Sequence, residues 1–96
     1  MGIVVKLPTA RHQLNQIIDY IAADNLTAAL NWLEEIEELF SLLSTQPFMA
    51  QEVQTKRLGK VRCHVYGNYS IYYQPIPGGV EIMRVFHGAR DQDRLV

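Results

Sequence analysis

Two amphipathic helical segments follow one another with almost no link between them, and this feature constrains the fold more than any other. We expect the first helix to run from a cap at Thr9 to about Asp24, and the second from a cap at Asn25 to a point before Pro47. In the first segment the apolar residues that share one helical face are Leu14, Ile17, Ile18 and Ile21. In the second they are Ala29, Leu33, Ile36, Phe40 and Leu43. A link of one or two residues forces the two helices to pack as an antiparallel hairpin.

The rest of the chain predicts β-strands around this hairpin. A first strand is expected over Ile3 to Leu7, and further strands over residues 61–66, 69–74 and 80–86. Gly67-Asn68 is typical of a two-residue turn between strands, and residues 48–60, which follow no period, are interpreted as an irregular connection. The predicted order is β-α-α-β-β-β. This is an α+β fold with the helical hairpin packed on one face of a mainly antiparallel four-stranded sheet.

Length and composition limit the class of protein. The 96 residues fit one domain, residues 1–96, and a single cysteine, Cys63, cannot form an internal disulfide, which is typical of the cytoplasm. No stretch approaches the roughly 20 apolar residues that span a bilayer, so we expect a soluble protein without membrane contact. The formal net charge of −1 argues against general attraction to polyanions such as nucleic acids.

The charge is unevenly distributed along the chain. Residues 1–55 hold two basic and seven acidic residues, whereas residues 56–96 hold seven basic and three acidic ones. This asymmetry is typical either of a basic face for an acidic partner or of the ordinary difference in surface composition between helices and a sheet.

Alternation over residues 61–66 predicts which polar side chains reach the open face of the sheet. We expect the apolar side chains to face the helices: Val61, Cys63 and Val65. The side chains that would then point away from the helices are Arg62, His64 and Tyr66. This arrangement predicts a basic, aromatic concavity. Arg84, in the middle of the last strand, must reach open surface or meet a buried acid.

Other candidate groups have both structural and functional interpretations. Trp32 is interpreted as a core or interface residue, with a functional aromatic as the alternative. The segment from His87 to Asp91 brings an imidazole, the Arg90 guanidinium and a carboxylate together, and could form a general-base site, a phosphate site or a capped turn.

Metal and cofactor sites are not indicated, and we predict neither. The residues that lack ligand spacing are His12, Cys63, His64 and His87. The glutamates at 34, 35, 37 and 38 are interpreted as a solvated helix face, and no glycine-rich loop precedes a helix as phosphate binding requires.

Several segments and their order resemble a known family over nearly the whole length. They are the segment from Ala28 to Ile36, Val61-Arg62 before a Gly-x-Tyr turn, residues 69–73 and the run from Val80 to Asp91. Together they resemble the ParE branch of the RelE/ParE toxin superfamily. The strand that ends in Arg-Val-Phe-His-Gly-Ala-Arg-Asp, residues 84–91, is the most specific of them.

The resemblance implies the toxin of a type II toxin–antitoxin module with a role in plasmid stabilization, encoded beside an antitoxin whose C-terminal segment wraps the toxin. ParE-like members poison DNA gyrase, whereas RelE-like members cut messenger RNA on the ribosome. The chain ends at Val96 without the terminal tyrosine of some nuclease relatives, and its charge of −1 contrasts with their basic character. Gyrase inhibition is therefore the favoured interpretation, and a ribosome-dependent endoribonuclease is the alternative.

These two interpretations assign different roles to the same residues. For the inhibitor no residue is catalytic, and the residues expected to bind target or antitoxin are Trp32, Arg62, Arg84, His87, Arg90 and Arg94. For the nuclease, Arg62 and Arg84 would neutralise phosphate and His87 would shuttle a proton. The expected partners are a cognate antitoxin and DNA gyrase, with no sequence-specific contact to nucleic acid. Without antitoxin we expect a homodimer.

Overall fold

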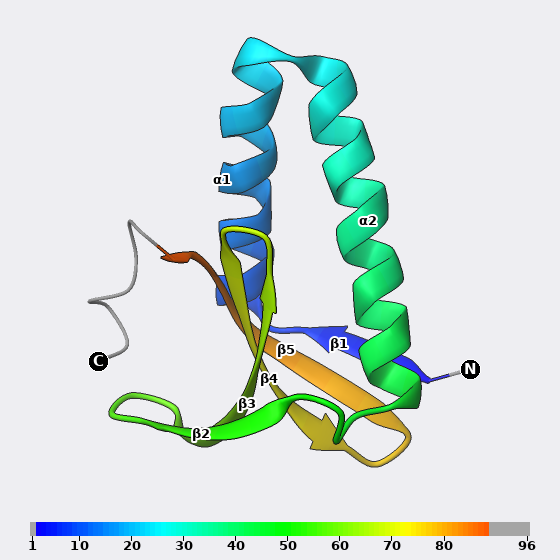
Figure 1. The fold of residues 1–96 in the computed structure, drawn as a ribbon, viewed down its shortest axis with the longest axis vertical. Coiled ribbons are helices and arrows are strands. Elements are labelled where there is room, and N and C mark those ends of the chain that lie inside the picture. Colours follow the sequence, from blue (N-terminus) through cyan, green and yellow to red (C-terminus); the bar gives the residue numbers. More distant parts are fainter. Residues whose placement is uncertain (1, 89–96) are drawn as a thin grey trace.

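In a computed structural model, which describes residues 2–88, two helices rise side by side from a five-stranded sheet (Figure 1). The helices are α1 (Pro8–Asp24) and α2 (Leu26–Thr45). The strands are β1 (Ile3–Lys6), β2 (Gln51–Thr55), β3 (Gly59–Tyr66), β4 (Tyr69–Ile76) and β5 (Gly79–His87). Their order in the sheet is β1-β5-β4-β3-β2, with β1 parallel to β5 and the other pairs antiparallel. Within the described residues neither helix is long and apolar enough to cross a membrane.

The predicted α+β fold is confirmed, but the prediction of four strands is wrong. The additional strand is β2, inside the segment that was interpreted as an irregular connection. Four of its five residues are polar, and Val53 is its one apolar side chain. An edge strand needs few apolar residues because solvent reaches much of its surface, so β2 lacks the alternation that identifies a half-buried strand.

The helical hairpin forms as expected, although α1 begins earlier than predicted. Asn25 alone links the helices, and its Oδ1 accepts a hydrogen bond from the Ala28 backbone N–H at 3.0 Å. Thr9 is not the cap of α1, because Leu7 occupies the N-cap position and Pro8 the first turn. Proline is favoured in the first turn of a helix, because its fixed φ is compatible with the helix and because a backbone N–H at that position would have no partner within the helix.

The hydrophobic core lies between the helices and one face of the sheet. The buried helical residues of this core are Ala10, Leu14, Ile17, Ile36, Leu39, Phe40 and Leu43. From the sheet come Ile71, Tyr73, Val80, Ile82 and Val85. At the edge of this layer Lys6 Nζ lies 2.5 Å from Glu37 Oε1 and 5.8 Å from the centroid of the Phe40 ring, so an ion pair ties β1 to α2.

The register of β3 contradicts the predicted orientation of its side chains. Directly paired residues on neighbouring strands share a face of the sheet, and Arg62 pairs with the fully buried Tyr73. Tyr66 packs against the core, whereas Val65 is 65% exposed. The even-numbered residues of β3 therefore lie on the face that carries the helices. Of the three residues predicted to face the helices only Val61 is buried, and it is outside the main core.

We predict that Asn25→Ala lowers the free energy of unfolding by about 1 kcal/mol, because the first turn of α2 loses its side-chain cap. Asn25→Asp keeps an acceptor oxygen and should remain close to the parent. Urea unfolding followed by circular dichroism measures the difference. Equal stability of the alanine variant and the parent would contradict the role given to this cap.

Candidate functional site

The three residues proposed for a nuclease site lie on different faces of the sheet. His87 pairs with Tyr69, on the face that the helices cover, and Arg62 lies on the same face. Arg84 pairs with Tyr72 and therefore lies on the opposite face. Within residues 2–88 no helix packs on this uncovered face, although Val61 and Phe86 are buried there. Along β4 the partners of Arg62 and His87 are four residues apart, which is roughly 13 Å of extended strand. The structure does not bring the three side chains to one site.

A β-bulge places Arg84 on the uncovered face. Tyr72 pairs with Arg84 and Tyr73 pairs with Ile82, so Met83 has no direct partner. This extra residue reverses the alternation of β5, and Ile82 and Val85 both reach the core although they are three residues apart. Without the bulge, Arg84 would share the buried face with Ile82. Arg84 was expected to reach open surface or to meet a buried acid. It is partly exposed, and within residues 2–88 it forms no ion pair with an acid.

Around Arg84 the uncovered face carries Tyr72 and Cys63 in one cross-strand row. The Arg84 Nη1 donates to the Met83 carbonyl at 2.7 Å, and within residues 2–88 no carboxylate forms an ion pair with it. Burial raises the pKa of the Cys63 thiol, although hydrogen bonds from Tyr72 and Ser70 partly oppose the effect. The thiol is therefore poorly ionised at neutral pH, and Cys63 is half-buried.

Arg62, on the face of the sheet that the helices cover, has a structural role. Its Nη1 donates to the Ala50 carbonyl at 2.6 Å and to the Phe48 carbonyl at 3.3 Å. Its guanidinium carbon lies 5.0 Å from the centroid of the Phe48 ring, a cation–π contact. Arg62 therefore holds the connection between α2 and β2 in place, and this role could not be inferred from its position in the chain.

Trp32 and His87 come together through Tyr69, where the turn of the β3–β4 hairpin packs against α2. The Trp32 and Tyr69 ring centroids are 5.1 Å apart, and those of Tyr69 and His87 are 5.4 Å apart. Beside them the Tyr66 hydroxyl donates to Glu35 of α2, and this bond to a carboxylate raises the Tyr66 pKa. The interpretation of Trp32 as a core or interface residue is confirmed, because its side chain packs against the core.

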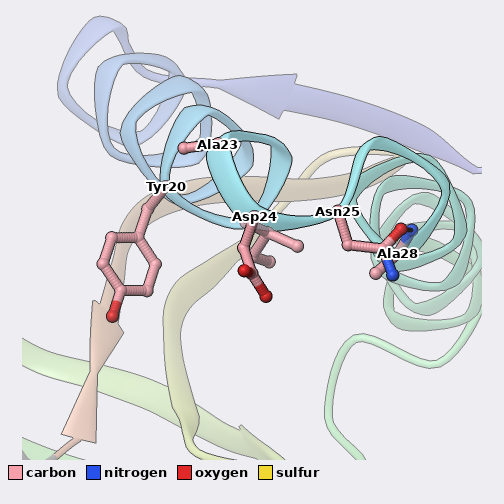
Figure 2. A pocket seen from close by; sticks show the side chains of 6 residues that line it. Tyr20, Ala23, Asp24, Asn25 and Ala28 are labelled. Atoms are coloured by element: carbon pink, nitrogen blue, oxygen red, sulfur yellow. Dashed lines mark hydrogen bonds between the residues drawn. The ribbon is translucent and has the colours of Figure 1, made fainter.

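The far end of the helical hairpin carries an exposed apolar surface that the sequence analysis did not identify. Tyr20, Leu26 and Leu30 are 69%, 63% and 56% exposed. Beside them an open hollow at the turn is lined by Tyr20, Ile21, Ala23, Asp24, Asn25 and Ala28 (Figure 2). Leu26 lies seven residues before Leu33 and extends the predicted apolar face of α2, whereas Leu30, one turn after Leu26, lies off that face. An apolar residue off the buried face was the signal available in the sequence.

The other candidates are not described by the structure. Arg90 and Arg94 lie outside residues 2–88, so the C-terminal segment from His87 to Asp91 is described only at its beginning. Among the described residues no three His, Cys, Asp or Glu side chains gather as metal ligands would. Within residues 2–88 the candidate residues therefore divide between two faces of the sheet and do not form a single site.

A substitution at Trp32 separates ring packing from hydrogen bonding. Its buried Nε1 has no hydrogen-bond partner within the described residues. We expect Trp32→Phe to leave the free energy of unfolding within about 1 kcal/mol of the parent, because no hydrogen bond is lost. Trp32→Ala should cost about 3 kcal/mol, because the contact with Tyr69 disappears. Chemical denaturation measures both, and equal losses in the two variants would contradict this account.

The chain matches the family model described as "ParE toxin of type II toxin-antitoxin system, parDE" over residues 4–92. A search of curated proteins returned no match. The family match includes both helices, the sheet from Val4 onwards and the bulged strand with Arg84. The chain therefore belongs to the ParE toxin family of type II toxin–antitoxin systems.

Proposed function

We propose that this toxin binds and inhibits DNA gyrase in the cytoplasm and that a cognate antitoxin neutralises it. The observation that carries the proposal is the separation of Arg62, Arg84 and His87 between two faces of the sheet. Cleavage of RNA needs a proton acceptor, a proton donor and cations around one phosphate. A surface that binds a protein needs no such convergence.

The uncovered face of the sheet is the surface that we assign to the target. Arg84 is partly exposed there, and within residues 2–88 it has no carboxylate partner that would neutralise its charge. The half-buried Tyr72 and the buried Phe86 flank it, with ring centroids 6.0 Å apart. An arginine beside aromatic side chains is typical of the residues that dominate protein interfaces.

The direct test is DNA supercoiling by purified bacterial gyrase in the presence of the purified chain. We expect inhibition that increases with toxin concentration, and translation of a reporter messenger RNA on ribosomes that proceeds without cleavage. Added antitoxin should restore supercoiling. Messenger RNA cleavage together with unaffected supercoiling would contradict the proposal and favour the endoribonuclease.

A second prediction concerns Arg84 itself. Arg84→Ala should raise the toxin concentration needed for half-inhibition of supercoiling about tenfold, which corresponds to about 1.4 kcal/mol of binding free energy. Arg11→Ala removes the same charge from an exposed position on α1 and should have no effect. Circular dichroism checks that both variants fold. Equal potency of the two variants would exclude the uncovered face as the target surface.

A further inference from the structure

The start of α1 holds β5 through two hydrogen bonds that lie on either side of the bulge at Met83. Before the bulge, the Leu7 N–H donates to the Ile82 carbonyl at 3.0 Å. After the bulge, the Val85 N–H donates to Gln13 Oε1 at 2.8 Å. Leu7 is the N-cap of α1, so both contacts come from one continuous segment of the chain.

The Gln13 side chain takes the place of a neighbouring strand at this point. β1 pairs with β5 only as far as Ile82, and β5 also contacts α1. Val85 is 1% exposed, so its N–H depends on a partner within the protein. A buried backbone N–H without a partner is costly, because it has lost its hydrogen bond to water and gained none in return. The Gln13 amide oxygen supplies that partner.

The position of Gln13 on α1 agrees with this role. The buried residues of the helix are Ala10, Leu14 and Ile17. Gln13 lies three residues after Ala10 and four before Ile17, so it is next to both on the helix surface. Its side chain is partly buried, whereas Gln16 is exposed. A polar side chain beside the core needs a hydrogen-bond partner, and the Val85 N–H provides one.

We propose that Gln13 is a positioning residue for Arg84. The hydrogen bond from Val85 to Gln13 holds the bulged segment of β5 so that the Arg84 side chain stays on the uncovered face. Ile82 and Val85 both reach the core, and Arg84 lies between them in the chain. A bulge disrupts the strand ladder locally, so this segment depends on contacts beyond its pairing with β4. The consequence for inhibition rests on the proposed function.

Loss of this hydrogen bond would loosen the bulged segment without removing β5 from the sheet. Arg84 still pairs with Tyr72, and Val85 still pairs with Ile71. Residues 83–85 could then open locally, because the bond to α1 no longer holds them. An arginine that samples several directions loses more conformational entropy when it binds, so its contribution to affinity falls.

Three variants of α1 test this role. Gln13→Met keeps the length and helix propensity of the side chain but offers only a weak sulfur acceptor to the Val85 N–H. Gln13→Glu keeps an oxygen acceptor at the same reach and should behave as the parent does. Gln16→Met makes the same replacement at an exposed position of α1 and is the matched control.

The first measurement is NMR of the purified chain, which needs no gyrase. In Gln13→Met we expect the Val85 amide to exchange with solvent about tenfold faster than in the parent, because a hydrogen bond that opposes local opening is lost. Cross-peaks between the Arg84 and Tyr72 side chains should weaken, since their direct pairing places both on the uncovered face. Gln13→Glu and Gln16→Met should keep the parent values.

The second measurement is the toxin concentration that half-inhibits supercoiling by gyrase. Gln13→Met should raise it about fivefold, because the Arg84 charge remains but is less well directed. In the Arg84→Ala background, Gln13→Met should cause no further loss, since Gln13 acts through Arg84. A role in overall stability alone would lower potency equally in both backgrounds.

Three results would overturn the inference: unchanged exchange of the Val85 amide in Gln13→Met, unchanged cross-peaks between Arg84 and Tyr72, or equal losses of potency with and without Arg84. If the parent inhibits gyrase and one of these results is found, the proposed function stands and Gln13 has no positioning role. If the parent does not inhibit gyrase but the NMR changes are as expected, the proposed function fails and Gln13 still positions Arg84.

Discussion

Burial of one face of the sheet under the helical hairpin is the constraint on which the rest of the structure depends. Tyr73 and Ile71 are fully buried on β4, and every residue paired with them shares their face. Arg62 on β3 is therefore on the face that carries the helices, and Arg84 on β5 is on the other. The orientations of the polar side chains follow from the burial of a few apolar ones.

The sequence predicted the elements whose signals are local. The apolar helical faces, the Asn25 cap and the Gly67-Asn68 turn depend on residues close together in the chain, and the structure confirms each of them. β2 was not predicted, because an edge strand requires few apolar residues and therefore shows no clear alternation. The cap of α1 was misassigned because Thr9 has a capping side chain, whereas Pro8 favours an earlier start through its backbone alone.

The positions of the site residues could not be predicted, because they depend on contacts between strands. Alternation in β3 defined two sets of side chains but not which set the helices cover, and the pairing of Arg62 with Tyr73 decides this. In β5 the continuous apolar run concealed the bulge at Met83, which keeps a charged side chain out of the core. The arginine within this apolar run indicated that a regular strand would place a charged side chain in the core. The bulge turns Arg84 to the opposite face, and Met83 loses its direct partner on β4 as a result.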